Sequence, residues 1–511
     1  FIHQSLELQC GELREWGIVA DVNQGPAAVR DMLHLIKSDE DMGAVVAADI
    51  KVGTSNLERL ISTSDGIQVT GDTLSANHHA SNVLFNIMRG GLFIENYAIK
   101  KADLMAFCTA WNASVTEASA AFFDLLPDDF TYHDLNTALS GNDDLCLERL
   151  CREYLPLSFS RRHGDPSRPW NRFAIKVKDE EGQKLLNYEG NWRDIFQNWE
   201  ALGSSIPCFG ANMISKFVNA TTADGYNPYR ITRQGIDWER PEPENPWANI
   251  GYWGDHQLIY LLKLIEQSLA HNPDALKSMM FRDAFAYANV PYRIKPYASI
   301  LSNPYDTIEF DDALDREIDE RVEQMGADGR LMIDPDGAVY QVNLAEKVLV
   351  TLLSKISNFI PDTGIWMNTQ RPEWNDANNA LVGTGVSVVT LCYLHRFLGQ
   401  AVVLFEDLEI DTIELSQEVA QLLTDVAGVL GEHQASLVSG PVSNMLRKQV
   451  MQALGTAAEH YREGIYARGF TGEKCKITRG TLVDFLSSAR DITAVSIASN
   501  RRDDGLYHAY N

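Results

Sequence analysis

The chain has 511 residues, of which 45% are apolar and 22% charged, a composition typical of a soluble globular protein with one large domain or a few ordinary ones. Acidic residues outnumber basic residues 70 to 44, and the formal charge of -26 disfavours a nucleic-acid partner because it repels phosphate backbones. No stretch approaches the roughly 20 consecutive apolar residues of a membrane helix, so we expect no membrane span.

The seven cysteines are scattered, and none forms a CxxC pair or a Cys/His group with the spacing of a zinc site. This usage is typical of a reducing compartment, so we expect a cytoplasmic protein without a metal centre. The sequence starts at Phe1 rather than Met and stops at Asn511 within a polar and aromatic run. We therefore expect both ends to be cut from a longer protein.

Residues 1–80 alternate short apolar runs with Gly, Asn and Asp, and we interpret them as a linker or mixed segment at the end of a preceding β-rich domain. From Asn82 onward, apolar residues recur with the 3.6-residue period of helices. Helices are expected over 101–126, 194–203, 256–270, 343–359, 386–398, 410–430, 442–466 and 480–489. A hairpin is expected around 329–342, where Asp-Pro-Asp-Gly supplies a turn.

This succession of helical hairpins predicts a mainly α fold, because amphipathic helices bury their apolar stripes against one another in pairs. A closed toroid of such pairs leaves a funnel at one end that is lined by loops. We expect an (α/α)6 barrel over residues 81–511, truncated at its C-terminus.

Three loops have an unusual composition, with aromatic, carboxylate and amide residues close together just ahead of a helix. They cover residues 188–194, 251–256 and 371–376. A sugar presents flat C–H faces, on which indole rings stack, and a rim of hydroxyl groups, which Asp, Asn, Arg and His bind. A single loop of this kind also fits a helix N-cap beside a wall residue. The repetition in three loops favours a carbohydrate site.

The third loop carries a resemblance to a known family. The run Glu373-Trp374-Asn375-Asp376, followed by Asn378 and Asn379, resembles the Trp-Asn-Asp motif of the cellobiose and chitobiose phosphorylase family. Those enzymes have an (α/α)6 barrel and belong to the wider superfamily of six-hairpin glycosidases. The resemblance implies that Asp376 is the general acid.

Other stretches agree with that family in order, from about 82 to 400. Trp192-Arg193-Asp194 with Gln197 is similar to its Arg-Asp-x-x-Gln segment, which lines the subsite of the non-reducing sugar, and Gly254-Asp255-His256 looks like its Asp-rich helix start. The predicted substrate-binding residues are Arg193, Asp194, Gln197, Trp192, Trp253, Asp255, His256, Trp374, Asn375 and Arg371.

Glycoside cleavage needs a proton for the leaving oxygen and a group that attacks the anomeric carbon. Like-charge repulsion from Glu373 and Asp255 would keep Asp376 protonated, although Glu373 also fits a partner for Arg371. In an inverting hydrolase a second carboxylate activates water, and the expected base is Asp504, with Asp503 beside it.

The sequence departs from the family at Ala377, where Gly is usual, and it shows no counterpart of the family's phosphate-binding segments. Hydrolysis and phosphorolysis therefore both stay open. We expect no cofactor, with inorganic phosphate as co-substrate in the second case. The substrate is expected to be an oligosaccharide or disaccharide, and the resemblance implies a homodimer.

Two other classes remain as alternatives. A polysaccharide lyase or sugar epimerase would need a Tyr/His or paired-His base, and a non-catalytic carbohydrate-binding protein would keep the fold without turnover.

Overall fold

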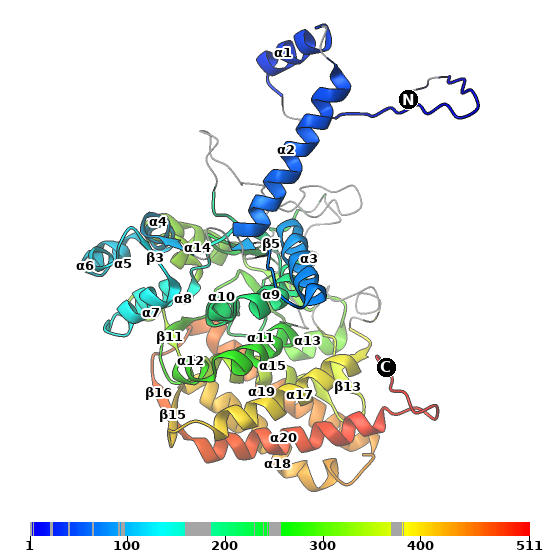
Figure 1. Cartoon of the computed structure of the whole chain (residues 1–511). Coiled ribbons are helices and arrows are strands. Elements are labelled where there is room, and N and C mark those ends of the chain that lie inside the picture. The colour runs from blue at the N-terminus through cyan, green and yellow to red at the C-terminus, as the bar shows by residue number, and fades with distance from the viewer. Residues whose placement is uncertain are drawn as a thin grey trace. The chain divides into compact units, whose positions relative to one another are not determined.

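The computed structural model describes residues 3, 5–20, 24–38, 41–63, 66–89, 92–93, 98–158, 185–228, 230–238, 240–242, 244, 257–368, 381 and 383–511. Within this part of the chain, most of the regular structure is helical, and the strands are short (Figure 1). The mainly α class predicted from the sequence is thus confirmed.

The chain divides into two compact units, Phe1–Leu60 and Ile61–Asn511. The first unit contains α1 (Pro26–Ile36) and most of α2 (Met42–Thr63), and α3 (Thr73–Arg89) belongs to the second. The described residues of the predicted mixed segment 1–80 are therefore helical wherever they have regular structure. The origin of this segment in a preceding β-rich domain stays a prediction.

The expectation of one helix over 101–126 is wrong. The structure has three short helices instead: α4 (Lys101–Trp111), α5 (Ala113–Ala118) and α6 (Ala120–Leu125). The break after α4 lies at Asn112, whose backbone is extended with φ -156° and ψ 100°. Its side chain accepts a hydrogen bond from the backbone N–H of Val115 and caps α5, so an amide that suits an N-cap ends one helix and starts the next.

The other predicted helices are confirmed, with boundaries that differ by several residues. The helices that follow α6 are α7 (Tyr132–Leu139), α8 (Leu145–Glu153), α9 (Trp192–Ser205), α10 (Gly210–Asn219), α11 (Gln257–His271), α12 (Pro273–Met279), α13 (Tyr297–Ser302), α14 (Asp312–Met325), α15 (Leu344–Ile356), α17 (Val388–Glu406), α18 (Gln417–Leu437), α19 (Asn444–Arg468) and α20 (Arg479–Ser499).

Short antiparallel sheets join the helix ends. The strands are β1 (Leu92–Phe93), β2 (Ile99–Lys100), β3 (Asp129–Phe130), β4 (Leu157–Ser158), β5 (Glu189–Asn191), β6 (Arg230–Thr232), β7 (Gly235–Asp237), β8 (Phe285–Ala286), β9 (Tyr292–Ile294), β10 (Ile308–Phe310), β11 (Gln341–Val342), β12 (Phe359–Ile360), β13 (Gly364–Trp366), β14 (Val386–Ser387), β15 (Thr412–Ser416) and β16 (Lys474–Thr478). Two three-stranded sheets, in the orders β5-β6-β7 and β12-β13-β14, matter for the candidate site.

Two of these strands correct the sequence expectations. Residues 412–416 were expected to begin a helix but form β15, which alternates exposed and buried residues and pairs with β16. The predicted hairpin around 329–342 has its turn at Gly337, with φ +87°, but only an isolated bridge joins Ile333 to Val339. The strand that follows, β11, pairs instead with the distant β8.

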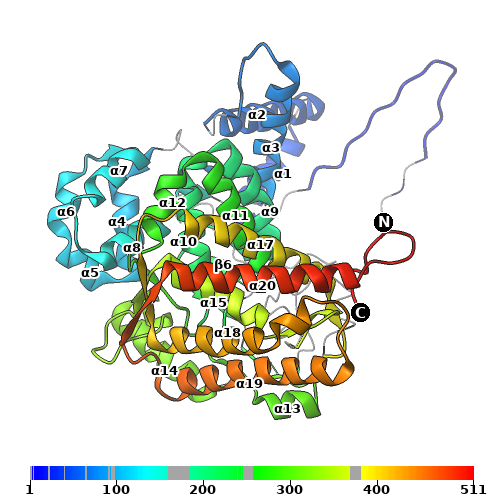
Figure 2. The ribbon, with the colours of Figure 1, turned by 90° about the horizontal axis from the view of Figure 1, so that it is seen from below.

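The large helices pack in neighbouring pairs. Helix α17 lies along α20, and α18 lies along α19 and contacts α15 and α20 (Figure 2). Among the described residues, α17 alone has the length and apolar composition to cross a membrane, but 56% of that stretch is buried inside the protein. Its contacts with α20, α11 and α15 are those of a core helix.

Candidate active site

The three loops that the sequence singles out precede α9, α11 and α17. Side-chain contacts fix the direction of the first two helices. The Nζ atom of Lys263 lies 2.7 Å from Oε1 of Glu200, and Nε2 of Gln267 donates to Oγ of Ser204 at 2.7 Å. Contacts therefore advance in the same direction along both helices, so α9 and α11 run parallel.

Two contacts fix the direction of α17 relative to α11 in the same way. Arg396 of α17 forms two hydrogen bonds of 2.6 Å with the carboxylate of Glu266 in α11. Beyond the ends of these helices, Nζ of Lys277 lies 3.4 Å from the carboxylate of Asp407. Both chain segments advance by the same number of residues between the two contacts. All three helices therefore begin at the same end of the layer, and each loop joins its helix there.

At the first loop, β5 leads directly into α9. The ring of Trp192 is 2% exposed and packs edge to face against Trp199 and Phe217, with centroid distances of 5.9 and 5.0 Å. This indole therefore belongs to the core beneath the loop, and its contact with a sugar stays a prediction. Arg193, Asp194 and Gln197 lie in the first two turns of α9, and their side chains are outside the described residues.

The other two loops lie outside the described residues. This applies to the predicted residues Trp253, Asp255, His256, Arg371, Glu373, Trp374, Asn375 and Asp376. Their roles stay predictions.

The base of the third loop is well defined. The backbone N–H of Gly383 donates to the carbonyl of Met367 at 2.6 Å, and that of Met367 donates to Gly385 at 3.1 Å. Strands β13 and β14 continue this pairing away from the loop. The two ends of the segment that carries Asp376 are thus held side by side at the start of α17.

Gly383 is required at this base for two reasons. Its φ is +82°, a conformation that side chains with a Cβ atom rarely adopt. A Cβ atom on Gly383 would also lie 2.4 Å from the carbonyl oxygen of Pro304.

Near the C-terminus, residues 501–511 return to the same sheet. The carbonyl of Ala509 accepts a hydrogen bond from Val388, and an isolated bridge joins Tyr510 to Ser387. Asp504, the predicted base, lies in the turn that precedes this pairing. Its carboxylate is exposed and forms a 2.6 Å ion pair with Arg502.

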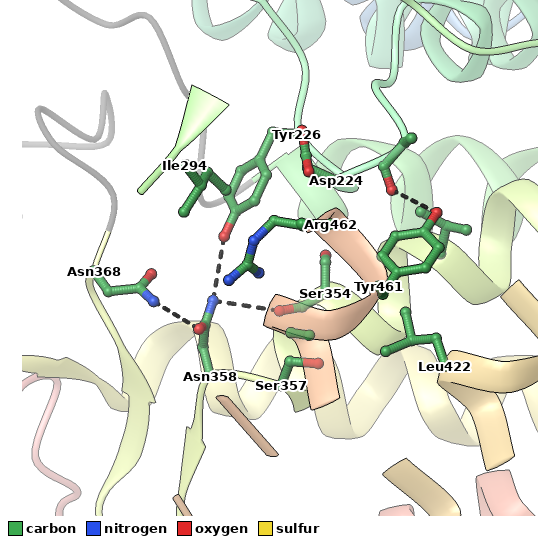
Figure 3. A pocket seen from close by; sticks show the side chains of 13 residues that line it. Asp224, Tyr226, Ile294, Ser354, Ser357, Asn358, Asn368, Leu422, Tyr461 and Arg462 are labelled. Atoms are coloured by element: carbon green, nitrogen blue, oxygen red, sulfur yellow. Dashed lines mark hydrogen bonds between the residues drawn. The ribbon is translucent and has the colours of Figure 1, made fainter. Parts of the chain in front are cut away.

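A small pocket lies beside the start of the third loop (Figure 3). The side-chain amide of Asn368 donates to Oδ1 of Asn358 at 2.8 Å, and Nδ2 of Asn358 contacts the hydroxyl of Tyr226 and the carbonyl of Ser354. The pocket holds about 20 Å³, enough for one water molecule and too little for a sugar. These hydrogen bonds hold Asn368, the last described residue before the loop.

A buried ionic cluster lies below the first loop, and sequence reasoning did not find it. Nζ of Lys216 lies 3.8 Å from the carboxylate of Glu153 and 4.4 Å from the centroid of the Trp111 ring. Arg149 contacts Glu153 at 3.4 Å and Asp328 at 2.6 Å. The only sequence signal is the placement of charged residues at core positions of α8 and α10.

Burial dominates the electrostatics of this cluster. It lowers the pKa of Lys216 to about 8, and the nearby Arg233 and Arg149 act in the same direction while Glu153 opposes them. Burial also raises the pKa of Glu153, although the neighbouring Lys216 and Arg149 favour its charged form. Such a cluster fixes the relative positions of α8 and α10, because an unpaired charge there would be costly.

Within the described part of the chain, no group of three or more His, Cys, Asp or Glu side chains is arranged to hold a metal ion.

The segment from β1 to the residues after α8 contains α4 and α8, which pack together, and α8 also packs against α10. Residues 93–156 match the family model described as glycoside hydrolase family 149 insertion domain 1. The match supports a relationship with glycoside hydrolase family 149, a family that contains phosphorylases. It thereby points to a carbohydrate-active enzyme. No curated protein matches the chain.

Proposed function

We propose that this protein cleaves glycosidic bonds of oligosaccharides or disaccharides with inversion, in a cleft where α9, α11 and α17 begin. The observation that carries the proposal is the parallel packing of these helices, because each follows a loop with the composition of a sugar site. The match of residues 93–156 supports the same class of chemistry independently.

The proposed architecture is an (α/α)6 barrel. The paired packing of α17 with α20 and of α18 with α19 is what neighbouring hairpins of such a barrel require. Under this proposal the starts of α9, α11 and α17 face the funnel.

Asp376 is the proposed general acid, which protonates the leaving oxygen. In hydrolysis, Asp504 would take a proton from the attacking water. Arg193, Asp194 and Gln197 would bind the hydroxyl groups of the non-reducing sugar, and Trp374 would supply a stacking face.

Phosphorolysis is the second candidate, favoured by the relationship with a family that contains phosphorylases. In that case inorganic phosphate would attack the anomeric carbon, and Asp504 would have no part in the reaction.

A panel of glycosides, assayed with and without inorganic phosphate, tests the proposal. Cleavage without phosphate supports hydrolysis, and release of sugar 1-phosphate only in its presence supports phosphorolysis. Asp376→Asn should lower the rate by roughly 10²–10⁴-fold, the usual contribution of general acid catalysis. Asp491→Asn, which alters an exposed carboxylate of α20, serves as the matched control.

The anomeric form of the first product, followed by NMR, tests inversion. Sugar binding without turnover, unchanged in Asp376→Asn, would overturn the catalytic proposal in favour of a binding protein.

A further inference from the structure

A second pocket, separate from the one beside Asn368, lies between the β5-β6-β7 sheet and the end of α14. The 3₁₀ helix η3 (Ala327–Arg330) and the end of α4 form its other walls. Three of the elements that line it, β5, α14 and α4, are labelled in Figure 1. Its volume is about 420 Å³, within the range of small-molecule sites. Ala110 and Gln234 at its walls are exposed, so solvent reaches the interior.

The sheet presents a polar face to this pocket because its side chains alternate. Glu189 pairs with Thr232, and Arg230 pairs with Asp237, so these four side chains share one face. All four line the pocket. Ile231, between Arg230 and Thr232, points the other way and is 1% exposed in the core.

The charges along the pocket compensate one another. Arg230 forms an ion pair with Glu189, and its Nη1 atom lies 3.1 Å from the carboxylate of Asp237. Nη1 of Arg330 lies 3.8 Å from the same carboxylate. The described lining therefore has two guanidinium groups and two carboxylates. An anion would meet no excess of positive charge, whereas neutral hydroxyl groups find both donors and acceptors.

The segment that matches the insertion-domain family contributes a wall. The indole N–H of Trp111 donates to the carbonyl of Arg233 at 3.2 Å, in the β6–β7 turn. Nδ2 of Asn112 donates to the carboxylate of Asp328 in η3 at 2.9 Å. The end of α4 is thus hydrogen-bonded to two of the other walls, the β6–β7 turn and η3.

We propose that this pocket binds one ring of a neutral carbohydrate, with Glu189, Arg230 and Asp237 as ligands to its hydroxyl groups. The choice of carbohydrate over other polyhydroxyl compounds rests on the proposed function. Glu189 lies three residues before Trp192, the first residue of α9, so the bound ring would lie beside the candidate cleft.

Hydrogen–deuterium exchange of the full chain tests this site with four separate probes: D-glucose, D-galactose, N-acetyl-D-glucosamine and inorganic phosphate. We expect slower exchange over residues 187–191 and 230–237 with at least one of the sugars. A bound sugar slows the exchange of amides that become exposed only when the site opens, by a factor of 1 plus the ratio of sugar concentration to dissociation constant. At about four times the dissociation constant, we therefore expect roughly fivefold slower exchange. Phosphate should give no protection there.

Two filling variants separate this pocket from the cleft. Ala110→Trp on α4 and Gln234→Trp in the β6–β7 turn place an indole into the pocket from exposed positions, and both should abolish the protection. Ala102→Trp, an exposed alanine of α4 outside the pocket, is the matched control and should retain it.

The results that test this pocket can be told apart from those that test glycoside cleavage. Asp376→Asn should keep the protection even where it abolishes glycoside cleavage. Protection without any cleavage would support this pocket and count against the enzyme. Cleavage without protection, protection by phosphate alone, or protection that survives both filling variants would overturn the pocket assignment.

Discussion

Val386 and Asn511 exchange two backbone hydrogen bonds, with N–O distances of 2.8 and 3.1 Å. Val386 belongs to β14, which closes the base of the loop that carries Asp376. The segment with Asp504 is therefore fastened to that base, although more than a hundred residues separate them in the sequence. The predicted acid and the predicted base thus belong to segments that meet at one sheet.

This attachment predicts different effects for two changes near the C-terminus. Deletion of residues 509–511 removes the hydrogen bonds to Val386 and Val388 and should lower the free energy of unfolding by roughly 2 kcal/mol. Asp504→Asn removes an exposed ion pair and should change the free energy of unfolding by less than about 0.5 kcal/mol. Urea titration measures both.

The Asp504→Asn variant also tests whether Asp504 is the general base. If the enzyme is a hydrolase, Asp504→Asn should lower the hydrolysis rate by roughly 10²-fold or more with unchanged stability. Full activity in this variant would exclude Asp504 as the base.

Two glycines allow the cost of close packing to be measured separately from the cost of a positive φ. Gly326 and Gly337 both have φ +87°, but a Cβ atom on Gly326 would lie 2.8 Å from the carbonyl oxygens of Ala110 and Trp111, whereas one on Gly337 meets nothing within 4 Å. Gly337→Ala should cost about 1–2 kcal/mol of unfolding free energy for the left-handed backbone. Gly326→Ala should cost several kcal/mol, because η3 must also move away from α4. Equal costs in thermal or urea unfolding would contradict the close packing.

The contacts of Asp362 predict which of two substitutions there lowers stability more. It is the non-glycine residue with positive φ (+63°) in the described chain, and its carboxylate accepts hydrogen bonds from the N–H of Val442 at 2.7 Å and the hydroxyl of Ser499 at 3.2 Å. Asp362→Asn keeps an acceptor and tolerates this backbone, so it should cost about 1 kcal/mol of unfolding free energy. Asp362→Ala should cost about 3 kcal/mol, because it leaves the partly buried N–H of Val442 unpaired and strains the turn. Urea titration should rank the two variants, and a reversed order would show that these contacts do not hold the turn.

The buried Lys216 predicts a pH dependence of stability. Burial places its pKa at about 8 in the folded protein, below the ordinary value of 10.5. Between these two values the unfolded chain binds more protons than the folded protein at this site, so stability should rise with pH across this window. The difference in unfolding free energy between the wild type and Lys216→Met should increase by up to about 1.4 kcal/mol per pH unit. A constant difference from pH 8 to 10 would contradict the lowered pKa of Lys216 in the folded protein.

Helices with a clear apolar stripe could be predicted from the sequence. In α11 the predicted stripe is Leu258, Leu261, Leu262, Ile265 and Leu269; the first four are fully buried, and Leu269 is partly buried near the end of the helix. The region 101–126 was less predictable. Its apolar residues also repeat like one helix, but Asn112 gains a cap and a contact with Asp328 by leaving the helical conformation.

The short strands could not be predicted, because each depends on a distant partner. Residues 412–416 pair with 474–478, and 341–342 pair with 285–286. Nothing in a five-residue window distinguishes such a strand from the first turn of the helix that follows it.

Composition predicted the three loops, but not that the helices after them would begin at the same end of one layer. That arrangement depends on the parallel packing of α9, α11 and α17, which long-range pairs such as Glu266 with Arg396 define. The polar face that Arg230 and Glu189 share also depends on strand register, so the second pocket left no signal in the sequence.

Helices that run in the same direction also align their peptide dipoles. Each start carries about half a positive charge, so three starts at one edge create a potential that favours anions. For a phosphate ion or an ionised base, this contribution is about 0.3–1 kcal/mol per helix start and falls off within the first turn. A carboxyl group at this edge keeps its proton at neutral pH only if burial or a neighbouring carboxylate outweighs that potential, so an acid catalyst on this layer depends on the acidic residues around it.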